Sequence, residues 1–244
     1  MVTTIQTTAS CKTDPGLRRS HNEDRCFVDN QKGYFLVADG IGGAAAGEIA
    51  SAIFAKTTVD TFSSRPERTT EETLKIVSIC FRSANSAILA DIAATPSHLG
   101  MGCTAELLAL QQDGFVLGHI GDSRTYLLRN KVLTRLTTDH SLVQQQLDLG
   151  LITAEEAKNH LLKNVILKAV GTEEQLEADI RQGHLEKGDL FLLCSDGLTD
   201  MVEEGRIHEV LLTEASLEQK AEELVKLANE AGGRDNITVV LVEA

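Results

Sequence analysis

Two stretches of the sequence share an arrangement that suits metal-ion chemistry, an apolar run followed by Asp-Gly. The run 35–38 leads to Asp39-Gly40, and the run 190–194 leads through a serine to Asp196-Gly197. Each run is typical of a buried strand, whose end holds a carboxylate rigidly where solvent and ligands can reach it. The glycine leaves its own carbonyl uncovered, as a second oxygen for a hard cation. One such turn is usually only the end of a strand, but its recurrence in the chain favours a metal-binding site.

Further acidic residues adjoin other predicted strands. Asp122 lies in a predicted hairpin turn, Asp235 directly precedes the last predicted strand, and Glu23 and Asp24 precede another. Carboxylates crowded at one sheet edge repel each other unless cations neutralise them. Oxygen ligands suit Mg²⁺ or Mn²⁺ rather than zinc, and two such ions can activate water for phosphate hydrolysis. Arg19 is the nearest guanidinium that could grip a phosphate.

The elements that position these residues follow from hydrophobic periodicity. The strands predicted at 26–28 and 34–38 form a hairpin, which places Glu23-Asp24 and Asp39-Gly40 at the same sheet edge. Four successive strands between 103 and 136 form a predicted meander, so the sheet is expected to be antiparallel. The remaining predicted elements are an edge strand within 1–14, strands at 179–185, 190–194 and 237–242, helices at 47–62, 70–94, 203–213 and 216–231, and two helical pieces within 137–167.

Composition limits the class of protein. The chain has 244 residues, no internal repeat and no evident linker, so we expect one domain over 1–244. A formal net charge of -13 without a basic cluster argues against nucleic acid as a partner. No apolar run approaches membrane-spanning length, and the N-terminus lacks the features of a signal peptide. The five cysteines are scattered, which predicts buried reduced thiols and a cytoplasmic protein.

Five motifs occur in order along the chain: Arg19-x-x-Asn22-Glu23-Asp24, Val37-Ala-Asp39-Gly40-Ile-Gly-Gly43, Gly118-His-Ile-Gly121-Asp122-Ser-Arg124, Ser195-Asp196-Gly197-Leu198 and Gly233-Arg-Asp235-Asn236. From about residue 10 onward the chain resembles the metal-dependent protein phosphatases (PPM, type 2C serine/threonine phosphatases) in their compact bacterial form. The resemblance implies an α+β fold, a four-layer α-β-β-α sandwich of two packed antiparallel sheets flanked by helices, with a binuclear metal site at one edge.

The resemblance also implies roles for the residues of the first and last motifs. Asp39 would bridge two metal ions and Gly40 would offer its carbonyl oxygen. Asp196 and Asp235 would ligate one ion. Arg19 would hold the substrate phosphate, so that Arg19 and Asp39 are the expected catalytic residues.

The other ligands and the surroundings follow from the same resemblance. Glu23 and Asp24 would hold the second ion, directly or through water, and Asp122 with Asp196 would match the third-metal site of bacterial members. The cofactor is thus Mn²⁺ or Mg²⁺, two ions with provision for a third. The segment at about 137–170 resembles the family's variable flap. The implied reaction is hydrolysis of phosphoserine or phosphothreonine in a phosphorylated protein by metal-activated water. We expect the protein to act in signal transduction as a monomer that does not bind membranes.

One position departs from the family pattern. Members often carry histidine after Asp-Gly-Met-Gly-Gly, whereas Ala44 stands here and cannot donate a proton. A general acid contributes roughly 100- to 10,000-fold in rate, so turnover of alkyl phosphates could be slow unless a water or His21 substitutes. The rival hypothesis is a pseudophosphatase, a phosphoprotein-binding regulator with the same fold. A nucleotide-binding loop at 42–47 is disfavoured because Glu48 stands where a lysine is needed, and a structural calcium site would leave Arg19 unexplained.

Overall fold

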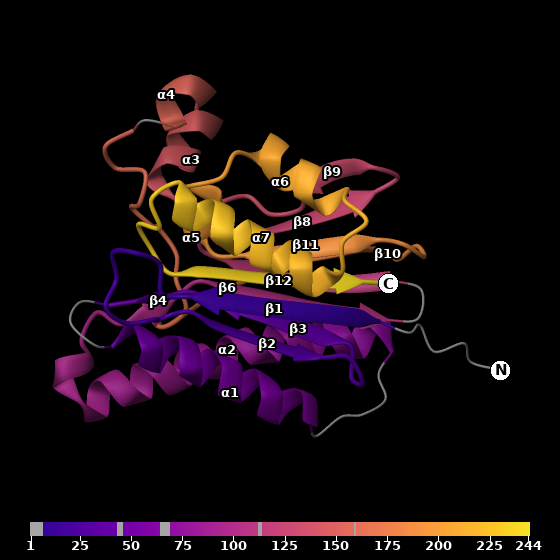
Figure 1. Cartoon of the computed structure of the whole chain (residues 1–244). Coiled ribbons are helices and arrows are strands. Elements are labelled where there is room, and N and C mark those ends of the chain that lie inside the picture. Colours follow the sequence, from indigo (N-terminus) through magenta and orange to yellow (C-terminus); the bar gives the residue numbers. More distant parts are fainter. Residues whose placement is uncertain (1–6, 43–45, 64–68, 112–113, 159) are drawn as a thin grey trace.

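The computed structural model describes residues 7–42, 46–63, 69–111, 114–158 and 160–244. Two five-stranded antiparallel sheets pack face to face, and helices cover the outer face of each sheet (Figure 1). This is the predicted four-layer α-β-β-α sandwich. The layers need four apolar surfaces, which explains why most strands of the chain are apolar on both faces.

The first sheet has the order β1-β12-β11-β8-β9. Its strand β1 lies at one edge, as predicted for the N-terminal segment, and all its neighbours pair antiparallel. The strands are β1 Thr8–Asp14, β8 Arg124–Arg129, β9 Val132–Arg135, β11 Leu190–Cys194 and β12 Ile237–Glu243.

The second sheet has the order β10-β7-β6-β3-β2 and contains the predicted hairpin. A separate two-stranded ladder joins β4, Gly40–Ile41, to β5, Gly102–Cys103. The strands of the large sheet are β2 Arg25–Asp29, β3 Tyr34–Ala38, β6 Ala105–Gln111, β7 Gly114–Ile120 and β10 Asp179–His184.

One prediction about the sheets is wrong. The sequence suggested that Asp122 lies in a hairpin turn of a continuous meander, but β7 belongs to the second sheet and β8 to the first. The short segment between them therefore crosses from one sheet to the other. Two successive apolar strands have the same sequence pattern whether the second pairs with the first or joins the other sheet. Periodicity therefore could not separate a hairpin from a crossing.

The helices lie in two groups. Helices α1, Gly47–Ser63, and α2, Thr70–Ala94, cover the second sheet, at the bottom of Figure 1. Thr69 and Glu72 form a capping box that starts α2, which matches the predicted boundary. The other helices are α3 Leu142–Asp148, α4 Ala154–Lys158, α5 Asp196–Thr199, α6 Glu204–Leu211 and α7 Leu217–Glu230, with a 3₁₀ turn at Pro96–His98.

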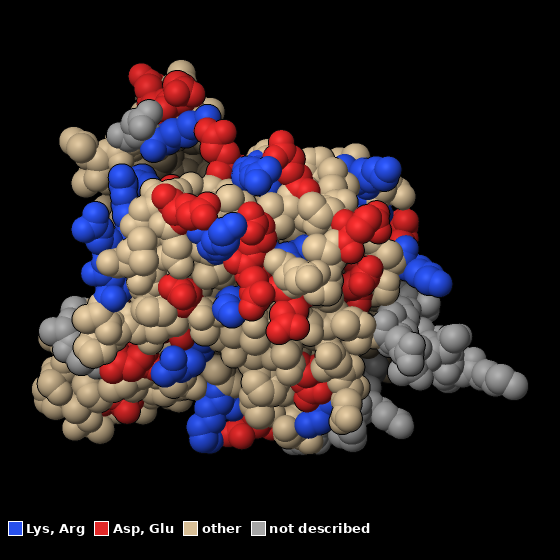
Figure 2. Space-filling model, viewed as in Figure 1, with Lys and Arg blue, Asp and Glu red and all other residues tan. Residues whose placement is uncertain are grey.

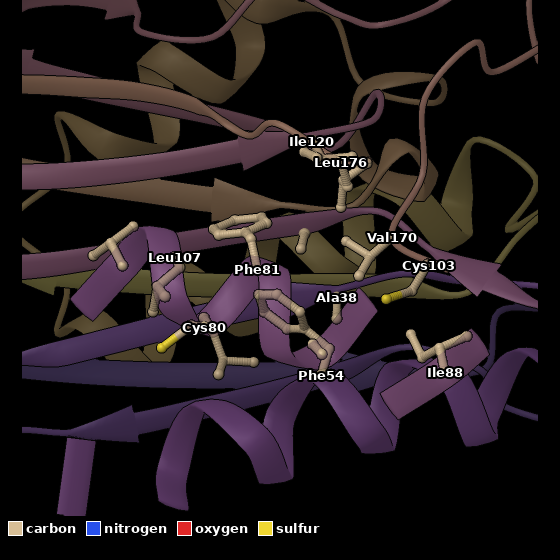
Figure 3. Packing of buried hydrophobic residues seen from close by; sticks show 14 of the residues in the cluster. Ala38, Phe54, Cys80, Phe81, Ile88, Cys103, Leu107, Ile120, Val170 and Leu176 are labelled. Atoms are coloured by element: carbon tan, nitrogen blue, oxygen red, sulfur yellow. The ribbon is translucent and has the colours of Figure 1, made fainter. Parts of the chain in front are cut away.

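Three apolar clusters join the layers. One lies between the two sheets, one beneath α6 and α7, and one beneath α1 and α2. In the last of these, Phe54 of α1 and Phe81 of α2 meet edge to face with ring centroids 5.1 Å apart (Figure 3). Helix α2 is long and apolar enough to cross a membrane by length and composition alone. Its buried face, however, packs against the sheet, as that of a core helix does.

The surface carries charges of both signs. Figure 2 shows Lys and Arg intermingled with Asp and Glu on the face formed by β1, α6 and α7. The cysteines only partly follow the prediction of buried thiols. Cys80, Cys103 and Cys194 are buried, but Cys11 is exposed and Cys26 is half-buried, because both lie on edge strands.

Candidate active site

The predicted acidic residues gather where strands of both sheets end. In the β2–β3 hairpin Arg25 pairs with Ala38, so Asp24 and Asp39 leave the same edge of the second sheet, as predicted. In the first sheet Cys194 pairs with Val239, which places Asp196, after β11, beside the start of β12. The two sheets are packed together, so these edges meet.

Asp24 is 1% exposed, and its Oδ2 accepts a hydrogen bond from Ser195 Oγ at 2.8 Å. Burial, partly offset by the hydroxyl groups and the Asp39 carboxyl group around it, raises the pKa of Asp24 to about 6.

Asp39 and Asp196 carry the strongest shifts. Burial raises the pKa of each well above its ordinary value, and the charges of neighbouring aspartates raise it further. Asp24, Asp196, Asp122 and Asp235 all act on Asp39, so the side chains of the five aspartates lie within electrostatic reach of one another. The sequence predicted this convergence from strand ends alone.

Asp122 approaches from the crossing between the sheets. It is 8% exposed, and burial together with the charge of Asp139 raises its pKa to about 7. Among the neighbouring charges, that of Asp122 raises the pKa of Asp196 most. This agrees with the pairing of Asp122 and Asp196 that the motifs suggested. Asp122 and Asp196 thus form the end of the acidic group that faces the segment 137–170.

Three buried carboxylate oxygens show that the group suits cations. Within the described part of the chain, the Oδ1 atoms of Asp24, Asp122 and Asp196 have no hydrogen-bond donor. A buried oxygen without a donor is costly, and a divalent cation removes that cost. Among the same residues no three His, Cys, Asp or Glu side chains surround one point as they stand. Mg²⁺ and ions like it take only one or two carboxylates per site plus several waters, so the donor set fits them.

Arg19, the expected phosphate anchor, lies at the rim of the acidic group. Its Nη2 is 2.7 Å from Asp235 Oδ2, and its side chain is half-exposed. Glu23 lies between this pair and the start of α1, because a Cβ on Gly47 would meet Glu23 Oε2 at 2.8 Å. Burial and the charge of Glu48 raise the pKa of Glu23, whereas Arg19 lowers it.

Gly40 adjoins the bridging candidate Asp39 in a crowded place. A Cβ there would lie 2.3 Å from the carbonyl oxygen of Gly47 and 2.7 Å from that of Glu23. No side chain fits between these backbone groups, so glycine is required sterically. The Asp-Gly pattern noted in the sequence is therefore a packing requirement as well as a candidate ligand pair.

Asn236 is a site residue that the sequence reasoning quoted in a motif but gave no role. It is 4% exposed, and its Oδ1 accepts a hydrogen bond from the Glu23 amide at 2.8 Å. Its Nδ2 donates to the carbonyl oxygens of Pro15 at 3.0 Å and His21 at 2.9 Å. One buried amide therefore fixes the loop that carries Arg19 and Glu23. Its position beside Asp235 was the only signal for it.

Two hydroxyl groups hold the aspartates in place in a similar way. Ser195 Oγ accepts a hydrogen bond from the Thr238 amide and donates one to Asp24 Oδ2, so it connects the strand ends of both sheets. Thr104 Oγ1 accepts the Asp39 amide at 3.3 Å and lies 2.6 Å from Ser123 Oγ. Such residues are not identifiable from spacing, because a buried serine or threonine has no sequence pattern of its own.

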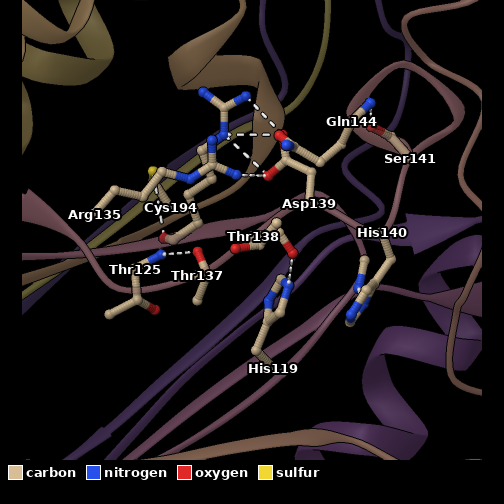
Figure 4. A network of polar contacts seen from close by, with 12 residues as sticks. His119, Thr125, Arg135, Thr137, Thr138, Asp139, His140, Ser141, Gln144 and Cys194 are labelled. Atoms are coloured by element: carbon tan, nitrogen blue, oxygen red, sulfur yellow. Dashed lines mark hydrogen bonds and ion pairs between the residues drawn. The ribbon is translucent and has the colours of Figure 1, made fainter. Parts of the chain in front are cut away.

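The segment 137–170 projects from the sandwich as α3 and α4 (Figure 1). A polar network holds its base (Figure 4). His119 Nε2 lies 2.9 Å from the carbonyl oxygen of Thr138, and His119 Nδ1 pairs with buried Glu106. Asp139 makes ion pairs with both Arg124 and Arg135.

A groove of about 610 Å³ runs between this segment and the helices after β11, and Asp122 and Asp196 line one end of it. At its other side Lys163 Nζ is 2.5 Å from Asp200 Oδ2. Ala44, where the family pattern has histidine, lies outside the described residues. His21 is exposed, and its charge acts on Glu23, so it lies close to the acidic group.

A two-sheet sandwich with carboxylates gathered at one edge defines a class, the metal-dependent phosphatases of the α-β-β-α type. The sequence profile described as Protein phosphatase 2C matches residues 18–241. The chain therefore belongs to the protein phosphatase 2C family and is a metal-dependent phosphoric monoester hydrolase.

Proteins similar to this chain include characterised phosphatases. The serine/threonine phosphatase stp of Listeria monocytogenes is 40% identical over 96% of this chain and 95% of its own length. The protein phosphatase PhpP of Streptococcus pneumoniae is 37% identical over 96% of each chain. The crystal structure of the serine/threonine phosphatase PstP of Mycobacterium tuberculosis superposes with a TM-score of 0.91 at 35% identity, covering 97% of this chain and 98% of that chain. A second structure of the PstP catalytic domain, in complex with two manganese ions, has a TM-score of 0.88.

Proposed function

We propose that this protein hydrolyses phosphoserine and phosphothreonine in phosphorylated proteins, with its reaction centre at the acidic edge of the sandwich. The observation that carries this proposal is the set of unpartnered buried oxygens on Asp24, Asp122 and Asp196. A fold would not bury such oxygens together unless something else neutralised them. The named relatives act as serine/threonine phosphatases, which agrees with this chemistry.

The ligand assignment follows the positions of the side chains. The charges of four other aspartates act on Asp39, so Asp39 would help to hold both ions, with the Gly40 carbonyl beside it. Asp196 and Asp235 would hold one ion and Glu23 and Asp24 the other, directly or through water.

A third ion would lie at Asp122 with Asp196, whose charges act on each other. We propose Mn²⁺ or Mg²⁺ as the ions, since all donors are oxygens. The manganese in the PstP complex supports the former. When bound, such ions lower the pKa of a water molecule and draw charge from a phosphoryl group.

The chain's own residues place the substrate. Arg19 is half-exposed and can therefore exchange Asp235 for a phosphate, which a guanidinium grips with two parallel hydrogen bonds. Asn236 keeps the Arg19 loop at a fixed position relative to the acidic group. Because the charge of Asp235 also acts on Asp39, a phosphate bound by Arg19 would lie near the acidic group.

The groove beside Asp122 and Asp196 is the place for the substrate chain. Its far wall belongs to the segment 137–170, which we propose as the flap of a single catalytic domain. The base of this segment is fixed by the Asp139 ion pairs, while its tip projects outward. We further propose a monomeric cytoplasmic protein that acts in signal transduction and binds neither membranes nor nucleic acid.

The pseudophosphatase alternative is disfavoured, because every acidic residue of the motifs is present and the named relatives are phosphatases. The two functions differ in release of phosphate from a phosphothreonine peptide. The proposal requires release with Mn²⁺ and none after chelation with EDTA. Tight peptide binding without release in Mn²⁺ would establish the alternative instead.

A further inference from the structure

Two cysteines outside the catalytic machinery face each other across the open edge of the sandwich. Cys11 lies on β1, the edge strand of the first sheet, and Cys26 lies on β2, the edge strand of the second. Strands β1 and β2 contact each other, and they run side by side in Figure 1.

Register places both thiols in the space between the sheets. The residue directly opposite Cys11 is Val240, and the residue opposite Cys26 is Val37. Both valines belong to the apolar cluster between the sheets, and cross-strand partners point to the same face of a sheet. Cys11 and Cys26 thus point toward each other from opposing layers.

The two thiols also differ as a reactive pair requires. Cys11 is exposed, and the interaction with the neighbouring Cys26 thiol lowers the pKa of Cys11 to about 7. Cys26 is half-buried. An accessible thiol of lowered pKa beside a less accessible second thiol is the arrangement of an oxidisable cysteine with its resolving partner.

We propose that Cys11 and Cys26 form a reversible disulfide when the protein meets a peroxide. The Cys11 thiolate attacks one oxygen of hydrogen peroxide, the O–O bond breaks, and the sulfenic acid forms with release of hydroxide, which takes up a proton as water. The Cys26 thiol then attacks the sulfenic sulfur, the S–S bond forms, and a second water leaves with the Cys26 proton. A thiol reductant reverses the bond by exchange.

The bond would act on the catalytic loop. It closes the segment 12–25, which carries Arg19, Glu23 and Asp24 and which Asn236 already holds from the other side. A covalent tie at its two ends restrains this segment in the unfolded chain more than in the folded one. The oxidised protein should therefore melt at a higher temperature than the reduced protein.

The test is mass analysis of the full chain after treatment with hydrogen peroxide, alkylation of free thiols and digestion without reduction. The proposal requires a cross-linked peptide pair containing Cys11 and Cys26 that disappears with dithiothreitol. In C26S, the sulfenic acid at Cys11 should persist and be trapped by a cyclic dione. C80S is the matched control, since Cys80 is buried and its loss should leave the cross-link intact.

Thermal unfolding gives a second reading that does not depend on phosphatase activity. We expect peroxide to raise the melting temperature of the wild type by roughly 5 °C or more, as expected for a loop of this length in a domain of this size. Dithiothreitol should reverse the rise, and C11S and C26S should show none. Cys11 left unmodified, or oxidised to sulfinic acid without a cross-link, would overturn the proposal, as would a cross-linked protein without the rise.

Discussion

Arg19 and Asp235 form an ion pair, with 2.7 Å between Nη2 and Oδ2, although they lie at opposite ends of the chain. Each of them is expected to have another partner in the reaction, a phosphate for Arg19 and a cation for Asp235. The pair is half-exposed, so solvent screens it and it contributes little to stability. Its exchange for those partners costs correspondingly little.

Replacement of Arg19 should therefore weaken substrate binding without weakening metal binding. We expect Arg19→Ala to lower kcat/KM on a phosphothreonine peptide by roughly 10- to 100-fold, mainly through a higher KM. Arg19→Lys should lower kcat/KM less, because lysine keeps the positive charge but lacks the two parallel donors of the guanidinium group. Calorimetric Mn²⁺ affinity should be unchanged or tighter. Arg18→Ala, an exposed neighbour, is the control. Kinetics of Arg19→Ala equal to those of Arg18→Ala would remove the anchor from the account.

Asn236 should be a structural requirement for the catalytic loop. Asn236→Ala removes two donated hydrogen bonds and leaves the Glu23 amide without its acceptor, which should lower the free energy of unfolding by about 2–4 kcal/mol. Asn236→Asp keeps the acceptor and should lose less. Chemical denaturation in EDTA measures both, with the exposed Asn30→Ala as control. An undiminished stability of Asn236→Ala would show that the loop is held by other contacts.

The metal-free protein should lose stability as pH rises. Burial raises the folded-state pKa of Asp24 to about 6 and of Asp122 to about 7, so the folded form keeps protons that the unfolded chain releases. By linkage, this contribution is present below the ordinary carboxyl pKa, and it is lost between about pH 4 and about pH 7.

The variant Asp122→Asn isolates that effect. Relative to the wild type in EDTA, its melting temperature should increase as the pH rises from about 4 to about 7 and level off above that, because the amide has no proton to lose. Asp60→Asn, which changes an exposed carboxylate, should follow the wild type. Saturating Mn²⁺ should remove most of this pH dependence from the melting temperature of the wild type. A constant offset between Asp122→Asn and wild type across this range would contradict the pKa assignment.

The departure at Ala44 leads to a prediction about leaving groups. If His21 or a water replaces the family histidine, aryl phosphates, which need little protonation of the leaving group, should be hydrolysed well compared with phosphoserine peptides. His21→Ala should widen that ratio. Relative rates on p-nitrophenyl phosphate and a phosphoserine peptide measure it. Equal or better rates on phosphoserine, with no effect of His21→Ala, would exclude this explanation.

Local patterns were sufficient for most of the fold. The helix predicted at 70–94 is found at Thr70–Ala94, because its capping box and its periodic apolar face are both local signals. The hairpin edge that joins Asp24 to Asp39 followed from antiparallel pairing alone. In contrast, the change of sheet at Asp122 depends on which layer receives the next strand, and no local residue records that choice.

The site shows the same division. Aspartates at strand ends could be found from their spacing, and the structure brings Asp39 and Asp196 within reach of each other. The amide of Asn236 and the hydroxyl of Ser195 matter through contacts with residues far away along the chain, Glu23 and Asp24. Their importance depends on burial and on long-range hydrogen bonds, which the sequence does not display.

The central claim is that Asp39 helps to hold the ions with which the protein hydrolyses phosphate esters. The most direct measurement combines Mn²⁺ titration by calorimetry with phosphate release from a phosphothreonine peptide for wild type and Asp39→Asn. We expect Asp39→Asn to lose Mn²⁺ affinity and to lose at least about 1,000-fold in rate. It should remain folded in EDTA, because burial already favours the neutral form of the Asp39 carboxyl group there and the amide has the same shape. Wild-type affinity and turnover in Asp39→Asn would contradict the account.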